Sequence, residues 1–396
     1  MTTAMTPSMP DRLDSDALTL NLVRDRLAAL GRQHTPIDVA SAMQAEGLAV
    51  SDSAVLDAVE SLRRQSVGAG PLEPLLREPS VTDVLVNGPN QVFIDRGAGL
   101  ELTKVRFPNE SAVRALAQRL AASVGRRLDD AAPFVDARLA DGTRVHAVLG
   151  CLASPGTCMS LRVPAQRSFS IEDCIASGSI TPGAAHVLSR MIESKLAFLI
   201  SGGTGSGKTT LLAALLALVP ARERIVIVED SRELAPNHPH LVRIEGRPAN
   251  AELAGAISLT DLVRQSLRMR PDRLVVGEVR GAEICDLLTA MNTGHEGGCG
   301  TVHANSTSDV PARLEALASL GGLPRAALHA QLASALDAVI HVTRNAAGIR
   351  HVAEISIFVR DATDGLVRSE CALAFHADGR TVLGPGSGQL ERLLDK

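Results

Sequence analysis

The segment ISGGTGSGKTT, residues 200–210, holds the residues of this 396-residue chain whose types and spacing point most clearly to chemistry. Gly202, four further residues, Gly207, Lys208 and Thr209 fit the phosphate-loop pattern. Glycines let the backbone N–H groups face one point, the following helix directs its positive dipole end there, and Lys208 adds a full charge. The predicted nucleotide-binding residues are Gly202, Gly203, Thr204, Gly205, Ser206, Gly207, Lys208, Thr209 and Thr210, with the Thr209 hydroxyl as a Mg²⁺ ligand.

Carboxylates follow two later apolar runs. IVIVEDSREL contains Glu229, Asp230 and Glu233, and RLVVGEVRG contains Glu278. A carboxylate at the end of a strand can orient a metal-bound water or accept its proton. The alternative is an acid that only suits a helix N-terminus. Catalysis is favoured for Glu278 and for Glu233, and both interpretations stay open for Glu229 and Asp230.

Two histidines flank the glycine-rich turn in TGHEGGCGTVHANS, residues 293–306. A lone histidine is usually a structural residue. Here the loop opens a strand expected beside the phosphate loop, so His303 can hydrogen-bond a γ-phosphate and respond to its loss. For His295 the structural and functional alternatives are equally open.

These residues need elements that bring them together. The apolar run 196–201 predicts a strand before the phosphate loop, and TTLLAALLALV predicts a helix after it. Further strands are predicted over 224–230, 241–245, 272–278, 300–304 and 337–344, with helical patterns between them. This alternation predicts an α/β fold with a doubly wound, mainly parallel sheet, which binds ligands at the carboxyl ends of its strands.

The rest of the chain divides by its pattern. Short alternating runs from about residue 68, with one helix over 111–123, predict a smaller α+β domain. Residues 1–12 are expected to be flexible, and apolar residues at helical spacing over 17–30, 37–45 and 55–64 predict a helical appendage. The expected divisions are a flexible N-terminus with this helical appendage over 1–66, the α+β domain over 67–165, a linker over 166–182, the phosphate-loop core over 183–345, and a β addition with a polar tail over 346–396.

Composition excludes some functions. The net charge is −4, and the chain has seven Phe but no Trp or Tyr, so binding of nucleic acid by base stacking is disfavoured. The six cysteines form no CxxC pair, which favours free thiols. The N-terminal residues do not resemble a signal peptide, and no apolar run is long enough for a transmembrane segment, so we expect a cytoplasmic protein.

The ordered motifs resemble a known family. The phosphate loop, EDSREL, VVGEVRG and TVHANS look like those of the secretion and pilus-traffic ATPases of type II and type IV systems. GPLEPLL, VTDVLVNGP and LRMRPDRLVVGEVRG look like the CpaF-type branch, which serves Tad (Flp) pilus assembly and conjugal-transfer-like systems. The resemblance covers about residues 68–345. TGHEGGCGTVHANS departs from it, because many members have Asp after the first histidine and fewer glycines.

This resemblance implies a homo-hexamer in which ATP and Mg²⁺ bind between a sensor-like α+β domain and a RecA-like motor domain. It assigns hydrolysis to Glu233 and Glu278, one or the other of which would also hold the metal through water, and maps the family's histidine onto His303. Arg144 and Arg162, with Arg138 as a weaker candidate, match arginines that reach the phosphates. It also implies integral-membrane platform proteins as partners and a position on the inner face of the membrane.

Three functions follow for comparison. The preferred one is a motor that powers Tad/Flp-type pilus assembly or type II/IV secretion, and the alternative is a conjugation-related DNA translocase. A kinase using the same phosphate loop is disfavoured, because no acceptor-substrate motif is evident. Arg268, Arg270 and Arg273 crowd the turn before RLVVGE, where a subunit contact and a solvated face are both open.

Overall fold

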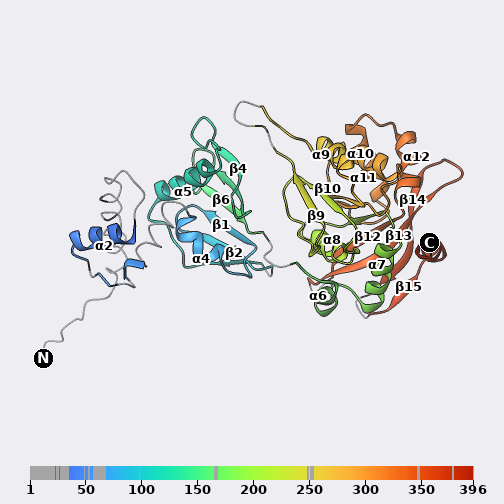
Figure 1. Cartoon of the computed structure of the whole chain (residues 1–396), viewed down its shortest axis with the longest axis horizontal. Helices are drawn as coiled ribbons and strands as arrows, with labels where there is room; N and C mark the ends of the chain where they lie inside the picture. Colours follow the sequence, from blue (N-terminus) through green and yellow to red (C-terminus); the bar gives the residue numbers. More distant parts are fainter. Residues whose placement is uncertain are drawn as a thin grey trace. The chain divides into compact units, whose positions relative to one another are not determined.

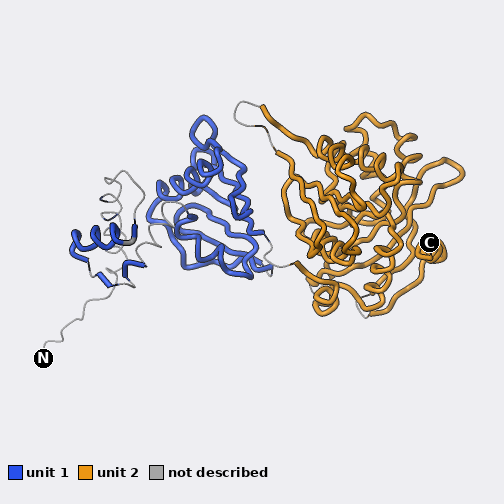
Figure 2. Tube along the Cα trace, viewed as in Figure 1, with its two compact units in different colours: residues 1–164 blue, residues 165–396 orange. Residues whose placement is uncertain are grey.

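The computed structural model divides the chain into two compact units, Met1–Pro164 and Ala165–Lys396 (Figure 2). Each unit is described by itself below. The structure describes residues 23, 26, 35–48, 50–51, 54–56, 68–97, 99–164, 168–247, 249, 254–345, 348–376 and 379–395.

The helix predicted over residues 37–45 is present as α2 (Pro36–Ala45). Thr35 caps it, accepting a hydrogen bond from the Asp38 N–H while the Asp38 carboxylate accepts from the Thr35 N–H. This reciprocal pair satisfies donors that a helix start leaves free. The expected flexible start over 1–12 lies outside the described residues, as do most of 17–30 and 55–64, where two further helices are predicted.

Unit 1 is built on a six-stranded antiparallel sheet with the order β3-β2-β1-β6-β5-β4. Its elements are η1 (Gly70–Leu72), α4 (Glu73–Leu76), β1 (Asp83–Asn87), β2 (Val92–Asp95), β3 (Leu100–Leu102), α5 (Glu110–Ser123), β4 (Phe134–Arg138), β5 (Arg144–Val148) and β6 (Cys158–Arg162). Asn109 caps α5, whose Val113, Leu116 and Leu120 are buried. The sequence pattern missed β4, because the exposed Phe134 beside the buried Val135 obscures the alternation.

Unit 2 is built on a nine-stranded sheet with the order β15-β14-β13-β12-β7-β11-β10-β8-β9. Its strands are β7 (Phe198–Ser201), β8 (Ile225–Glu229), β9 (Leu241–Glu245), β10 (Arg273–Val279), β11 (Cys299–Val302), β12 (Ala338–Arg344), β13 (Arg350–Arg360), β14 (Val367–Phe375) and β15 (Thr381–Leu383). Neighbouring strands pair in parallel along β12-β7-β11-β10-β8-β9, and the hairpin strands β13, β14 and β15 pair antiparallel at the other edge. This confirms the predicted mainly parallel α/β sheet.

Helices cover both faces of this sheet (Figure 1). One apolar core lies under α6, α7, α8 and α13, and the other under α9, α10, α11 and α12. The bounds are α6 (Ile171–Ala176), α7 (Pro182–Glu193), α8 (Lys208–Leu216), α9 (Leu259–Ser266), η2 (Leu267–Met269), α10 (Glu283–Met291), α11 (Val310–Leu320), α12 (Arg325–Ala335) and α13 (Ser387–Leu394). Strand β7 is buried throughout, because side chains from both of its faces enter a core.

Two expected segments differ in the structure. The expected linker over 166–182 contains α6, whose Ile171 and Cys174 are buried in the core of unit 2. The expected polar tail is wrong for residues 387–394, which form α13 and bury Leu390 and Leu394. Both segments are rich in polar residues and contain few apolar side chains, so their sequence pattern does not predict a helix. The helices become evident only in the structure, where those few apolar side chains pack into the core.

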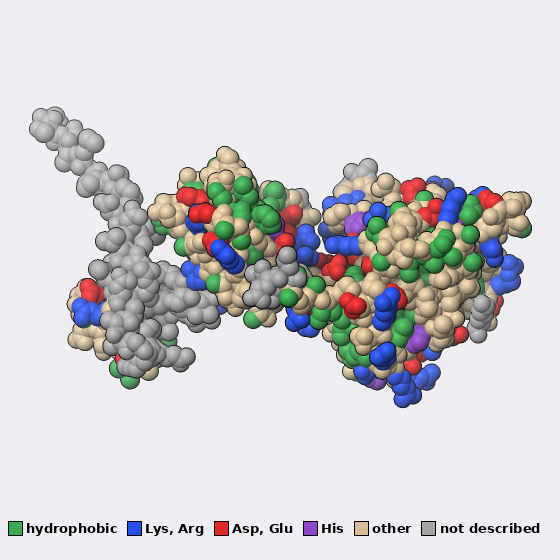
Figure 3. Space-filling model, turned by 90° about the horizontal axis from the view of Figure 1, so that it is seen from above, with side chains coloured by type: hydrophobic (Ala, Val, Ile, Leu, Met, Phe, Trp, Pro, Cys, Tyr) green, Lys and Arg blue, Asp and Glu red, His purple; other side chains and the backbone are tan. Residues whose placement is uncertain are grey.

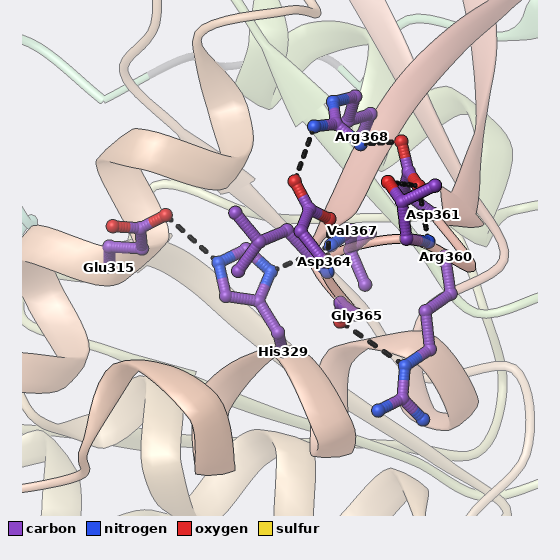
Figure 4. A network of polar contacts seen from close by, with 10 residues as sticks. Glu315, His329, Arg360, Asp361, Asp364, Gly365, Val367 and Arg368 are labelled. Carbon is purple, nitrogen blue, oxygen red and sulfur yellow. Dashed lines mark hydrogen bonds and ion pairs between the residues drawn. The ribbon is translucent and has the colours of Figure 1, made fainter.

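A polar network joins the C-terminal strands to the helices of one face (Figure 4). The buried His329 of α12 accepts a hydrogen bond at Nδ1 from the Val367 N–H at 2.8 Å, and its Nε2 lies 2.9 Å from the Glu315 carboxylate of α11. Arg368 of β14 pairs with Asp361 and Asp364, which lie in the turn between β13 and β14. The network thus ties β14 to α11 and α12.

Burial makes two of the cysteines unreactive. All six are described and are free thiols. Burial raises the pKa of Cys299 to about 12 and that of Cys174 to about 11, so both stay protonated. Across the described part of the chain, no helix has the length and apolar character that crossing a membrane requires.

Candidate active site

The predicted phosphate loop leaves the centre of the unit 2 sheet. It follows β7, which lies between β12 and β11, and leads into α8. Gly202, Gly205 and Gly207 have φ of 151°, 67° and 98°, which L side chains rarely adopt. A Cβ on Gly202 would lie 2.2 Å from the Val342 carbonyl oxygen. Glycine at this position therefore has a steric cause.

Lys208 turns back onto the loop. Its Nζ donates to the carbonyl oxygens of Gly202 and Gly203, each at 2.9 Å. Burial lowers the pKa of Lys208, and the nearby Glu278 and Glu233 carboxylates act in the opposite direction. Ser206 beside it has a buried hydroxyl that makes no hydrogen bond within the described structure. The loop therefore holds both a buried cation and an unsatisfied donor.

The remaining predicted loop residues lie on the outer side. Thr204 is exposed, Thr209 is half-buried, and Thr210 is exposed. Thr209 and Thr210 belong to the first turn of α8. The Thr209 hydroxyl therefore stands at the N-terminus of a helix, directly after Lys208.

Glu278 and His303 come together from the ends of β10 and β11. Glu278 Oε1 lies 2.5 Å from His303 Nε2, an ion-pair distance without hydrogen-bond alignment. Arg280 donates to the other carboxylate oxygen of Glu278. His303 Nδ1 lies 3.5 Å from Lys208 Nζ. The structure thus joins Lys208, His303 and Glu278 in one chain of polar contacts.

The surroundings of His303 favour its neutral form. Burial lowers its pKa, the Lys208 ammonium acts in the same direction, and Glu278 opposes them. A contact from the Lys208 ammonium requires an unprotonated Nδ1, which leaves the ring proton on Nε2, the nitrogen nearer to Glu278. His295 does not join this group: its Nδ1 lies 3.2 Å from the Ala290 carbonyl oxygen.

The acidic segment is anchored by Glu229. This residue is 3% exposed, and its Oε1 accepts from the backbone N–H groups of Glu233 at 2.9 Å and Leu234 at 2.8 Å. A Cβ on Gly277 would lie 2.6 Å from Glu229 Cγ, so the Glu229 side chain packs against the main chain of Gly277, one residue before Glu278. Burial raises its pKa. The geometry favours a structural role for Glu229, while the Glu233 side chain is exposed.

A cavity of about 340 Å³ opens beside the loop. Its lining consists of Gly202, Gly203, His303, Ala304, Asn305, Asp309 and Arg313. The sequence analysis missed Asn305, Asp309 and Arg313. Asn305 could have been noticed by its position in HANS, but Arg313 belongs to the amphipathic pattern of α11 and carries no signal of its own.

Three of the predicted arginines share one row of the unit 1 sheet. Arg138, Arg144 and Arg162 are consecutive cross-strand partners on β4, β5 and β6, and Asp83 on β1 continues the row. Arg162 Nε donates to Asp83 at 3.1 Å. Arg144 and Arg162 are exposed. Their contact with phosphates involves both units and stays a prediction.

Arg273 is neither a subunit contact nor part of a solvated face. It is 1% exposed, its Nε lies 2.7 Å from Glu223, and its Nη2 donates to the Ile192 carbonyl oxygen at 2.9 Å. Arginine can be buried when its charge is paired and its donors are satisfied. Both alternatives considered for this residue are therefore wrong.

Comparison with known proteins agrees with this architecture. The profile of the type II/IV secretion system protein family matches residues 65–382. A Mycobacterium tuberculosis protein named for conjugal transfer is 53% identical over 335 residues, which are 83% of this chain and 94% of that protein. The type IV secretion system protein PtlH of Bordetella pertussis is 32% identical over 319 residues, covering 73% and 93% of the two chains.

Among solved structures, the Legionella pneumophila ATPase DotB matches with a TM-score of 0.51 at 18% identity, covering 74% of this chain and 80% of that one. This likeness concerns the fold. Family membership rests on the profile match and the sequence relatives. With the ordered motifs meeting at the carboxyl ends of one parallel sheet, the chain belongs to the type II/IV secretion system family of traffic ATPases.

Proposed function

We propose that the protein is a cytoplasmic homo-hexameric motor that hydrolyses Mg-ATP to drive type IV-related secretion or assembly of a Tad/Flp-type pilus. The observation that carries this proposal is the chain of contacts from Lys208 through His303 to Glu278. It links a phosphate-binding lysine to a strand-end carboxylate, which are the groups that a nucleotide hydrolase needs near one phosphate.

The loop fits a nucleotide phosphate. Gly202, Gly205 and Gly207 adopt backbone angles that other residues rarely adopt, Lys208 is a buried cation, and the Ser206 hydroxyl is buried without a partner among the described residues. Residues 202–210 would hold the phosphates, and Thr209 would hold Mg²⁺, with Glu233 or Glu278 acting through water. Bound Mg²⁺ would neutralise charge on the phosphate oxygens.

Glu278 is the proposed group that orients or deprotonates the attacking water, with Glu233 as its partner in the acidic segment. Arg280 and His303 on either side of Glu278 hold its carboxylate in place. His303 would respond to the γ-phosphate, because its ring connects Lys208 with Glu278. Arg144 and Arg162 would stabilise charge on the transferred phosphoryl group when unit 1 closes.

The transported material distinguishes two versions of the motor. The relatives named for conjugal transfer favour the DNA translocase as the second candidate. Figure 3 shows Lys and Arg side chains interspersed with Asp and Glu on the visible face of each unit, and the chain has no Trp or Tyr. These features disfavour contact with nucleic acid. In this proposal the partners are integral-membrane platform proteins, at the inner face of the membrane.

The test is Mg-ATPase activity measured across size-exclusion fractions with mass detection, for the wild type and Lys208→Ala, with and without single-stranded DNA. We expect activity confined to a hexamer-sized peak, abolished in Lys208→Ala and indifferent to DNA. Activity of the monomer would contradict the ring. Strong stimulation by DNA would favour the translocase.

A further inference from the structure

The C-terminal end of strand β12 contacts the phosphate loop and the end of the strand that precedes it. His341 Nδ1 lies 2.9 Å from Ser201 Oγ at the end of β7. One residue further, the Val342 carbonyl occupies the space that a side chain on Gly202 would need. At the end of the strand, Arg344 Nη2 donates to the Gly205 carbonyl oxygen at 2.9 Å. The strand therefore supports the loop from its start to its middle.

The next strand of the hairpin continues this support. Arg350, the first residue of β13, is the cross-strand partner of Arg344. Its Cδ lies 3.4 Å from the position of a Cβ on Gly207. Arginine side chains from both strands of the β12–β13 hairpin thus lie against the loop, at Gly205 and Gly207.

The Arg344 contact determines where a neighbouring donor points. In a trans peptide, the carbonyl of one residue and the N–H of the next point in opposite directions. Because the Arg344 guanidinium holds the Gly205 carbonyl, the Ser206 N–H points away from Arg344, inward to the loop. This N–H makes a 3.3 Å hydrogen bond to the Gly203 carbonyl, which also accepts from Lys208. Phosphate loops bind anions through inward N–H groups, so a bound phosphate would take over the Ser206 N–H from the Gly203 carbonyl.

We propose that Arg344, supported by Arg350, is a positioning residue that preorganises the phosphate loop for nucleotide binding. The β12–β13 hairpin then couples the C-terminal strands of the sheet to the nucleotide site. This inference rests on the proposed function, because it concerns the same nucleotide. Its expected effect is on affinity, since Arg344 shapes the loop and the hydrolytic carboxylate lies on another strand.

The test compares Arg344→Ala, Arg344→Lys and the control Arg360→Ala by titration with a fluorescent ADP analogue and by steady-state ATPase kinetics. Arg360, at the end of β13, suits as a control because, like Arg344 at the end of β12, it is an exposed arginine that donates to a glycine carbonyl, that of Gly365 at 3.2 Å (Figure 4). Loss of one solvent-exposed hydrogen bond predicts Kd and KM about 3- to 10-fold higher in Arg344→Ala. We expect kcat within about twofold, partial recovery in Arg344→Lys, and no change in Arg360→Ala.

Several outcomes would overturn the inference. They are an Arg344→Ala affinity equal to or tighter than wild type, an equal loss in Arg360→Ala, and a fall in kcat with unchanged KM. Hydrogen exchange of residues 203–207 gives a second measurement, and faster exchange is expected in Arg344→Ala alone. If the wild type itself binds no nucleotide, the proposed function fails, whereas normal wild-type binding with an unaffected Arg344→Ala removes only this inference.

Discussion

Glu229→Ala tests whether the acidic segment is held by one buried carboxylate. The substitution removes the acceptor of two backbone N–H groups, those of Glu233 and the buried Leu234. A buried donor left without a partner costs about 1–3 kcal/mol. The Glu233 N–H, on a residue with an exposed side chain, regains water more easily than that of Leu234. The expected loss of unfolding free energy in unit 2 is therefore about 2–4 kcal/mol.

The assay is urea denaturation followed by far-ultraviolet circular dichroism, because the chain has no Trp or Tyr to report by fluorescence. The matched control is Glu245→Ala. Glu245 is the cross-strand partner of Glu229, and it accepts from the backbone N–H of Arg232 in the same segment at a longer 3.4 Å. We expect less than about 1 kcal/mol for this exposed contact. Equal denaturation midpoints for the two variants would refute the anchoring argument.

Three further predictions concern the site and the core. Glu278→Gln should still bind Mg-ATP while single-turnover hydrolysis falls about 10²- to 10³-fold, and a wild-type rate would contradict its assignment. Burial raises the pKa of Glu229, so the stability that this group contributes is present below its unfolded pKa and is lost as pH rises through its folded pKa. The free energy of unfolding of Glu229→Gln, measured by urea denaturation, should therefore be higher relative to wild type at pH 7 than at pH 4. His329→Ala leaves the Val367 N–H without its partner, while the Glu315 carboxylate keeps only Arg325 among the described residues, so the same assay should show a loss of about 1–3 kcal/mol.

Local chemistry made much of the site predictable from sequence. Glycines whose backbone angles other residues rarely adopt, followed by Lys208, form a pattern within one short loop. Apolar runs that end in Glu278 or His303 indicate strand ends, and parallel strands bring such ends to one edge. These residues were predicted separately, and the structure places them within contact distance.

The sequence by itself therefore determined the phosphate loop, the mainly parallel sheet and the strand-end residues, because each depends on neighbours within a few positions. Only the tertiary structure decided the strand order, which places β12 beside β7 and so brings Arg344 to Gly205 across 139 positions. It also decided that Glu229 anchors a loop, that Arg273 is buried, and that residues 387–394 complete a core. Such contacts depend on which surfaces pack together, and the periodicity within a single helix or strand does not predict that packing.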